Sequence, residues 1–219
     1  MPRLLFEKTG NAVWISHLDL MRLFQRAFKR AGLPLKHTQG FNPRPSVSIA
    51  LPLSVGVSST CELLDFDLDG CEASCEEICA RLNECLVSGV HVLQVYEGGR
   101  KIRDLSLLRC CVTMEYDGGV PANTEQCVRS LFQQSSLIVP KKTKSGMQDQ
   151  DIIPMIRNLE VCRAGEKRVE LQCLICCQNP TLNPAQLSQA VCMYLPELKP
   201  DFSSCSRIEI YDINEKVFR

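Results

Sequence analysis

Residues 17–34 read HLDLMRLFQRAFKRAGLP, and this stretch decides how the first part of the chain folds. Apolar side chains recur in it at the spacing of one helical face. A glycine follows the last charged turn and a proline comes two residues later, which is typical of a helix end. The stretch therefore predicts an amphipathic helix over about residues 17–31. Its apolar stripe consists of Leu20, Met21, Phe24, Ala27, Phe28 and Ala31.

Short apolar or alternating runs flank this helix, and such runs predict strands. Together with a second helix, they give the order β–α–β–β–α–β, which is that of a ferredoxin-like split βαβ unit. The order opens with two short strand-like runs around a turn at residues 9–11, RLLFEKT (3–9) and AVWIS (12–16). The other predicted elements are strands in SVSIALPL (46–53), CELLDFDLD (61–69) and VHVLQVYE (90–97), and a second helix over about 72–87.

The polar, glycine-led run GGRKIRDLS (98–106) predicts a linker, after which the same scheme returns. We therefore expect an α+β fold of two tandem ferredoxin-like (βαββαβ) subdomains, residues 1–98 and 106–219. The second set comprises strands in SLLRCCVTMEY (106–116), LIVPKKT (137–143), RVELQCLICC (168–177) and SRIEIYDI (206–213), helices in TEQCVRSLFQQ (124–134) and PAQLSQAVCMYL (184–195), and a further ordered piece in IIPMIRNLEVCR (152–163).

Charge and hydropathy exclude some classes of function. The 25 basic residues balance the 25 acidic ones, so no overall field draws the chain to a polyanion. The first residues lack the apolar core of a signal peptide, and no apolar run has the length of a membrane span. We expect a cytoplasmic protein without membrane contact.

Fourteen cysteines stand in a long, core-rich chain, which indicates reduced thiols rather than a disulfide scaffold. Cys71, Cys75 and Cys79 share a spacing of four, which follows one helical stripe and suits an ion poorly. The run CLICC (173–177) has no second cysteine or histidine pair beside it. The sequence therefore predicts no metal site and no cofactor, although a metal at either cluster is an alternative.

The predicted first helix opens with SHLD, in which Ser16 and Asp19 form the pattern of a capping box. A second face of the same helix is basic, and three of its arginines follow one another at spacings of four. This row predicts contacts with phosphates, the alternative being a solvated face. The basic residues are Arg22, Arg26, Lys29 and Arg30.

The next segment, LKHTQGFNPRPSV (35–47), is crowded with residues that restrict or redirect the backbone. Gly40, Pro43 and Pro45 predict a stiff loop, which loses little entropy on binding. Such a loop can present an aromatic ring for stacking, cations for phosphates and an amide for a base edge. The side chains expected to do so are Lys36, His37, Phe41, Asn42 and Arg44. The alternative is a rigid connection with Phe41 in the core.

A second basic cluster, Lys141, Lys142 and Lys144, lies beside Gly146 in the second half. It predicts an extension of the same cationic track, and the alternative is a solvated loop.

The run from residue 6 to residue 59 closely resembles the opening of the radical SAM-linked proteins, a bacterial family with a domain of unknown function. Lys8, Gly10, SHLDL (16–20), RAFKRAGLP (26–34) and GFNPRP (40–45) match its pattern, with Lys29 where arginine is usual. Weaker matches are KKTKSGMQDQDIIPMI (141–156) and RIEIY (207–211). The resemblance implies a protein encoded beside, or fused to, a radical SAM enzyme with a cobalamin-type domain. It also implies an RNA-related role, and it brings no catalytic residues.

Three hypotheses follow. In the first, the chain binds RNA, ribosomal or transfer RNA among the candidates, or presents it to the radical SAM enzyme. The chain has no CxxxCxxC motif, so the chemistry would then belong to that partner. In the second, the chain is a metal-independent endoribonuclease that uses His17 or His37 as acid or base. In the third, it is a protein-docking module without RNA contact, with the acidic stretch 62–77 as its docking face.

Overall fold

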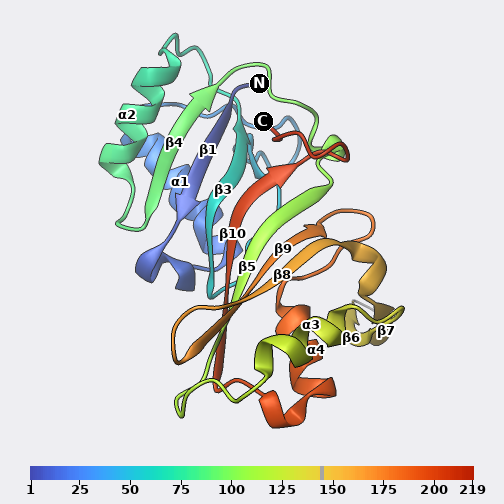
Figure 1. Ribbon diagram of the computed structural model, residues 1–219. Coiled ribbons are helices and arrows are strands. Elements are labelled where there is room, and N and C mark those ends of the chain that lie inside the picture. Colours follow the sequence, from blue (N-terminus) through green and yellow to red (C-terminus); the bar gives the residue numbers. More distant parts are fainter. Residues whose placement is uncertain (144–145) are drawn as a thin grey trace. The chain divides into compact units, whose positions relative to one another are not determined.

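Four α-helices and a mainly β core make up the part of the chain that the computed structural model describes, residues 1–143 and 146–219 (Figure 1). The predicted mixture of helix and strand is confirmed. The chain divides into two compact units, Met1–Ile102 together with Arg219, and Arg103–Phe218. The amide of Arg100 donates to the carbonyl of Arg219 at 2.9 Å, which holds the last residue on the first unit.

The first unit is a small antiparallel sheet covered by two helices. In the sheet, β1 pairs with β3 on one side and with β4 on the other, and β2 pairs with the end of β3. Leu64 of β3 thus lies between Leu4 of β1 and Ile49 of β2. The elements are β1 (Arg3–Lys8), α1 (His17–Arg30), β2 (Val47–Ile49), β3 (Val57–Phe66), α2 (Cys75–Cys85) and β4 (Val90–Tyr96).

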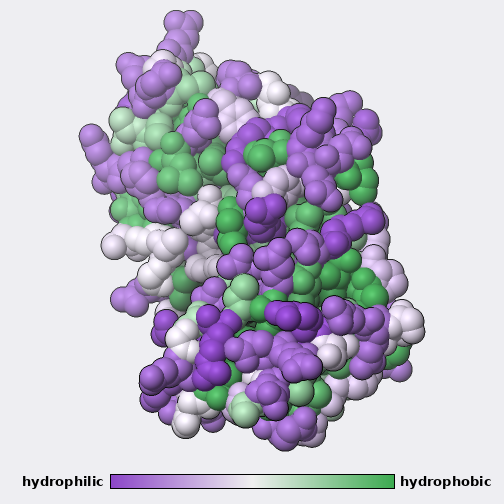
Figure 2. All heavy atoms as spheres, in the orientation of Figure 1, coloured by the Kyte–Doolittle hydropathy of each residue, from purple (hydrophilic) through white to green (hydrophobic). Residues whose placement is uncertain are grey.

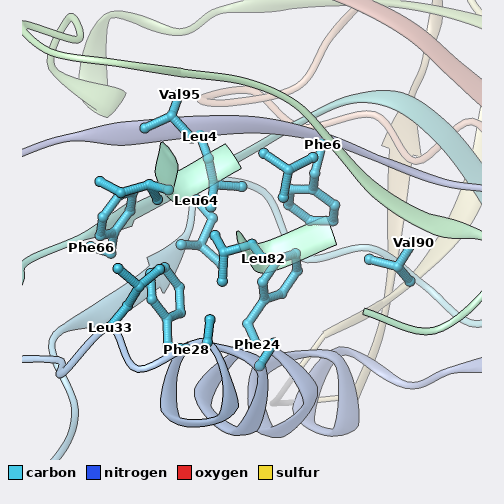
Figure 3. Packing of buried hydrophobic residues seen from close by; sticks show 14 of the residues in the cluster. Leu4, Phe6, Phe24, Phe28, Leu33, Leu64, Phe66, Leu82, Val90 and Val95 are labelled. Atoms are coloured by element: carbon cyan, nitrogen blue, oxygen red, sulfur yellow. The ribbon is translucent and has the colours of Figure 1, made fainter. Parts of the chain in front are cut away.

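The core of this unit forms where both helices pack on one face of the sheet (Figure 3). Phe24 and Phe28 point from α1 toward side chains of β1 and β3. Phe24 meets Phe6 edge-on with ring centroids 4.8 Å apart, and Phe28 meets Phe66 at 4.9 Å. Aromatic pairs in such geometries contribute about 0.5–1.5 kcal/mol beyond the area they bury. The apolar stripe of the sequence is therefore the face that fixes α1.

One predicted strand is wrong. Residues 12–16 do not extend; the chain turns through a 3₁₀ helix, Gly10–Trp14, which Gly10 enters with a φ of +52°. Lys8 is fully buried, and its ammonium group donates to the carbonyls of Val13 at 3.0 Å and Ile15 at 2.8 Å. Because these contacts satisfy the lysine's charge, the chain curls around it instead of pairing.

The second unit is built on a four-stranded antiparallel sheet with the order β10-β5-β9-β8, and β6 and β7 pair separately. Its buried apolar side chains include Val112 on β5, Leu171 on β9 and Leu187 on α4. The elements are β5 (Leu107–Glu115), α3 (Thr124–Phe132), β6 (Ile138–Thr143), β7 (Gly146–Asp151), β8 (Ile156–Arg163), β9 (Arg168–Cys176), α4 (Ala185–Tyr194) and β10 (Phe202–Tyr211).

The sequence pattern missed β7 and the first half of β10. The run GMQDQD of β7 carries almost no apolar side chain, and all its residues are exposed or half-buried. Apolar and polar side chains therefore do not alternate along it. It pairs with β6 from Ile138 opposite Asp151 to Thr143 opposite Gly146. Backbone pairing alone therefore makes it a strand.

All fourteen cysteines are free thiols. Cys110 and Cys173 stand opposite each other on β5 and β9, and both are buried. A hydrogen bond from Cys173 raises the pKa of Cys110, and burial raises the pKa of Cys177 to about 12. Cys110 and Cys177 are thus held in the protonated, unreactive form.

Of the five cysteines of the first unit, Cys61 is buried and the other four are only half-buried. Figure 2 shows hydrophobic residues gathered over α2 and the neighbouring strand β4, where Cys75, Cys79 and Leu93 line a groove of about 380 Å³. Cys79 donates from its thiol to the carbonyl of Val92 at 3.4 Å. Burial raises the pKa of Cys75 and of Cys79.

Thiol labelling of the native protein at mildly alkaline pH tests this ranking. We expect Cys162 to react first, because it is exposed, and Cys110, Cys173 and Cys177 to react only after unfolding. Mass spectrometry of labelled peptides identifies each site, and Cys162→Ser removes the fastest phase whereas Cys177→Ser leaves it unchanged. Labelling of Cys177 in the native protein at the rate of Cys162 would contradict the packing described.

Candidate functional site

The basic face of α1 is directed away from the core by the anchoring of its apolar stripe. Since residues three and four apart share a helical face, burying Phe24 and Phe28 turns the opposite side chains outward. The exposed residues of this face are Arg22, Arg26, Lys29 and Arg30. The predicted helix, with its charges on the surface, is therefore present.

The N-terminus of α1 is capped, but not by a complete capping box. The hydroxyl oxygen of Ser16 accepts from the amide of Asp19 at 3.2 Å, as predicted. The carboxylate of Asp19, however, accepts from that hydroxyl at 2.7 Å and pairs with Arg22 at 2.9 Å. The Ser16 hydrogen bond first, and Arg22 second, lower the pKa of Asp19. Asp19 therefore neutralises Arg22, one of the arginines expected to contact phosphates.

The reciprocal capping box occurs on α2 instead. The hydroxyl of Ser74 accepts from the amide of Glu77 at 3.2 Å, and the Glu77 carboxylate accepts from the Ser74 amide at 2.8 Å. The pattern S-x-x-E is present in the sequence at this point. Our sequence analysis overlooked it.

The C-terminus of α1 ends in a Schellman motif, which sets the direction of the chain that follows. The amide of Leu33 donates to the carbonyl of Phe28 at 2.9 Å and that of Gly32 to Lys29 at 3.2 Å. Gly32 has a φ of +63°, and a Cβ there would lie 2.9 Å from the guanidinium of Arg81. Only glycine fits this position without strain.

Arg81 of α2 covers the last carbonyl groups of α1. Its guanidinium donates to the carbonyl of Ala31 at 2.9 Å and to that of Gly32 at 3.0 Å. A helix C-terminus carries partial negative charge, and a cation on its carbonyls offsets that charge. Sequence reasoning missed Arg81, although it is the one basic residue in an otherwise acidic helix.

Residues 36–46 form a small hairpin, which we call the basic hairpin. The amide of Ser46 donates to the carbonyl of Lys36 at 2.7 Å, and the amide of Thr38 to that of Arg44 at 2.9 Å. The hydroxyl oxygen of Thr38 accepts from the amide of Arg44 at 3.0 Å. His37 pairs with Pro45 between these bonds. The stiff loop expected from the sequence is therefore a hairpin with paired arms.

The tip of the basic hairpin carries the residues that the sequence singled out. Gly40 has a φ of +142°, a backbone conformation that suits glycine. Phe41 is 107% exposed, so the alternative in which its ring lies in the core is wrong. Asn42, Pro43 and Arg44 are exposed as well. An aromatic ring fully in water at a hairpin tip is available for contact with a partner.

The base of the hairpin is tied to the segment after β3. The amide of Lys36 donates to the carbonyl of Asp67 at 2.9 Å, and the amide of Asp67 to that of Ser46 at 3.1 Å. The ammonium group of Lys36 also lies 3.4 Å from the Asp67 carboxylate. Lys36 is therefore partly neutralised, and it serves the hairpin more than a ligand.

Two grooves flank the basic face of α1, each of about 680 Å³. The first, which we call the hairpin groove, lies between the C-terminal part of α1 and the basic hairpin. The second, the helix groove, runs along the other side of α1 as far as Val87. Arg26 and Lys29 line both grooves. Gln25, Gly32, Leu33, Pro34, Leu35, His37 and Pro45 complete the hairpin groove.

The cations of the site differ in whether they form an ion pair or a hydrogen bond within the protein. Arg22 pairs with Asp19, and Arg30 donates to the carbonyl of Cys85. Within residues 1–143 and 146–219, Arg26, Lys29 and Arg44 form no ion pair. These three side chains are exposed. They are the charges that an anionic ligand would meet first.

The two histidines of the ribonuclease hypothesis stand apart. His17 is the first residue of α1, whereas His37 lines the hairpin groove beyond the other end of the helix. Nδ1 of His17 is buried, and within the described part of the chain it neither accepts nor donates a hydrogen bond. The ribonuclease hypothesis, with His17 or His37 as acid or base, stays a prediction.

The second basic cluster lies on the second unit. Lys141 on β6 donates to the carbonyl of Thr181 at 2.9 Å, so it is engaged, and Lys142 is exposed. Lys144 lies outside the described residues. The proposed extension of the cationic track through these lysines stays a prediction.

The acidic stretch 62–77 is used in part by contacts within the first unit. Glu62 is buried, Asp65 pairs with Arg3 at 2.5 Å, and Asp67 lies beside Lys36. Glu77 caps α2. Asp69, Glu72 and Glu76 are exposed and form no ion pair within the described residues, so the docking hypothesis stays a prediction.

Within the part of the chain that the structure describes, no group of three or more acidic, histidine or cysteine side chains is placed to hold a metal ion. None of the described helices is both long and apolar enough to cross a membrane.

A family model described as "Uncharacterized protein conserved in bacteria (DUF2344)" matches residues 2–184, so the chain belongs to this family. No curated protein matches the chain. Among solved structures, a chain titled "Crystal Structure of a Cbf5-Nop10-Gar1 Complex" aligns with 95% of this chain at 9% identity and a TM-score of 0.51. The alignment spans 48% of that chain, about half its length. A protein from Galdieria sulphuraria aligns over 97% of both chains at 12% identity, with a TM-score of only 0.26.

The sequence search for site residues also missed the floor of the hairpin groove. Leu33, Pro34 and Leu35 connect the helix to the hairpin. In the sequence this segment was interpreted only as the end of the helix. A signal was present, because two leucines flank a proline where a connection would ordinarily be polar.

Gly32→Ala tests the Schellman motif that directs the hairpin. We expect the free energy of unfolding to fall by about 1–2 kcal/mol, because alanine is strained in the left-handed region and its Cβ meets Arg81. Urea unfolding measures the change. Gly118→Ala is the matched control, since a Cβ there meets nothing within 4 Å and its φ is not left-handed. Equal stability of the two variants would contradict the assignment.

Proposed function

We propose that this protein binds RNA through the basic face of α1 and the basic hairpin, and that it has no chemistry of its own. The observation that carries the proposal is the set of three exposed cations without an ion pair in the described chain, Arg26, Lys29 and Arg44, beside a fully exposed Phe41. Cations for phosphates and an aromatic ring for bases are the two parts of a single-strand binding surface.

The alternative ligands are less well matched. A folded acidic protein would also be attracted to the cations, but an isolated aromatic ring at a stiff tip suits a stacked base better than a flat protein surface. A small anion alone would leave Phe41 without a role. The charges and the ring together therefore favour an RNA strand over either.

We further propose that each unit is a ferredoxin-like repeat, so that the chain is a tandem of two. In the first unit, the order β–α–β–β–α–β combines with antiparallel pairing of β4 with β1, β1 with β3 and β3 with β2. In the second, β10, β5, β9 and β8 take the corresponding positions once the β6-β7 hairpin is set aside. Ferredoxin-like sheets are a common scaffold of RNA-binding modules.

The proposed partner is a radical SAM enzyme with a cobalamin-type domain, and the proposed role is to hold or present the RNA that this enzyme modifies. Support comes from the motif resemblance of residues 6–59 alone. The RNA class, ribosomal or transfer RNA, and a location in the cytoplasm belong to the same proposal.

Salt dependence of RNA binding tests the cationic surface. If Arg26, Lys29 and Arg44 each neutralise one phosphate of a single strand, counterion release predicts a slope of roughly −2 in log K against log salt. Replacing all three by glutamate should flatten the slope and weaken binding at least about tenfold. Fluorescence anisotropy with labelled single-stranded RNA measures both quantities.

Lys167, Lys199 and Lys216, all exposed on the second unit, provide the matched control when replaced together by glutamate. This variant makes the same change in net charge. Both proteins should keep the unfolding temperature of the wild type, because the substituted side chains are exposed. Equal losses of affinity in the two variants would show a non-specific charge effect and would reject the site.

Phe41→Ala tests the hairpin tip separately. Stacking of one base on an aromatic ring contributes about 1–3 kcal/mol, so we expect affinity for single-stranded RNA to fall roughly tenfold. The salt slope should stay unchanged, since no charge is lost, and so should stability, because the ring is in water. Phe202→Ala, at another exposed phenylalanine, is the control. Undiminished affinity of the Phe41 variant would exclude stacking at the tip.

A further inference from the structure

The hairpin groove has two chemically different sides. Its floor is apolar, and its volume of about 680 Å³ lies within the range of small-molecule sites, roughly 300–1,000 Å³. One wall is cationic and belongs to α1, with Arg26 and Lys29. The opposite wall belongs to the basic hairpin and presents His37. The floor consists of Leu33, Pro34, Leu35 and Pro45.

The groove lies at a helix C-terminus, a position that ordinarily repels anions. Here Arg81 donates three hydrogen bonds to the carbonyls of Ala31 and Gly32, which offsets the partial negative charge. Lys29 and Arg26 stand within the last two turns, where their charge adds to this effect. The end of α1 therefore accepts an anionic group instead of repelling it.

A ligand that fits both sides must join an apolar surface to an anion. A sugar phosphate offers the charge but no apolar face for the leucines and prolines. An acyl chain offers apolar surface but no group that forms hydrogen bonds with Gln25 and His37, which line the groove. A nucleotide has both parts, and its base edge can form hydrogen bonds with Gln25 and His37, which line the same groove.

We propose that the hairpin groove receives one unstacked nucleobase of a single-stranded RNA, with an adjoining phosphate on Arg26 and Lys29. This inference rests on the proposed function and specifies its ligand: a strand with at least one base turned out of the stack. The base lies against the leucine and proline floor, and His37 and Gln25 face its edge.

Phe41 stands on the same hairpin, so the strand meets a second base contact nearby. Three residues separate the His37–Pro45 pair from the tip, which is roughly 10 Å at the rise of an extended chain. A short oligonucleotide spans that distance. The groove and the tip would then hold different bases of one strand, and Phe41 must be removed before the groove can be tested alone.

The test therefore uses the Phe41→Ala protein. Its affinity is measured for a short oligoadenylate and for the same ribose-phosphate chain without bases. Both chains carry the same phosphates, so their difference reports base contacts. We expect the oligoadenylate to bind roughly tenfold more tightly, as for one base held on protein side chains. Equal binding of the two chains would overturn the groove assignment while leaving phosphate binding, and hence the proposed function, in place.

A second experiment fills the hairpin groove with a larger side chain. Gln25→Trp, added to Phe41→Ala, places a large side chain in the groove without changing charge and should abolish the remaining preference for bases. Leu18→Trp on the same helix is the control, because Leu18 is exposed and lines neither groove. Thermal unfolding confirms that both variants are folded. A preference for bases that survives Gln25→Trp would also overturn the assignment.

Two further outcomes separate this inference from the proposed function. If the wild-type protein binds neither chain even at low salt, the proposed function fails, and the groove assignment fails with it. If free adenosine monophosphate binds as tightly as the oligoadenylate, the ligand is a free nucleotide, and the assignment to RNA is overturned.

Discussion

The packing of α1 on its sheet is the interaction on which the rest of the first unit depends. Two phenylalanines of the helix, Phe24 and Phe28, meet Phe6 of β1 and Phe66 of β3 with ring centroids less than 5 Å apart (Figure 3). Because the helix is rigid, burying these rings places every other side chain of α1. The charged face, both grooves and the exit direction of the chain all follow from that single orientation.

The connection after α1 converts this orientation into a site. The Schellman motif at Gly32 turns the chain back, the apolar residues after it form a floor, and the basic hairpin rises from the segment beside Asp67. Each part also has a structural reason: Arg81 satisfies helix carbonyls and Lys36 satisfies a carboxylate. Within the described residues, the charged groups of Arg26, Lys29 and Arg44 form no ion pair, and the ring of Phe41 is fully exposed. Side chains that the fold does not use are the ones available to a ligand.

Local signals allowed much of the fold to be predicted. The helix α1, its glycine stop and the strands of alternating apolar residues depend on spacing along the chain, which the sequence displays directly. The failures come from contacts between segments, which spacing along the chain does not display. Residues 12–16 were expected to be a strand, but the buried charge of Lys8 curls them. That charge acts through space, so the apolar pattern of the segment does not show it. The strand β7 has no apolar pattern and exists through its pairing with β6.

For the site, the amino-acid order alone was enough to indicate a basic helix followed by a stiff, aromatic-tipped loop, since charge, glycine and proline act where they stand. It was not enough to tell which of those charges are free. Asp19 and Asp67 neutralise Arg22 and Lys36, and the carbonyl of Cys85 engages Arg30. Two of these three contacts join residues far apart in the chain, so only the folded structure decides them. The same holds for the hairpin groove, whose floor and walls come together because the helix end reverses the chain onto its own basic face.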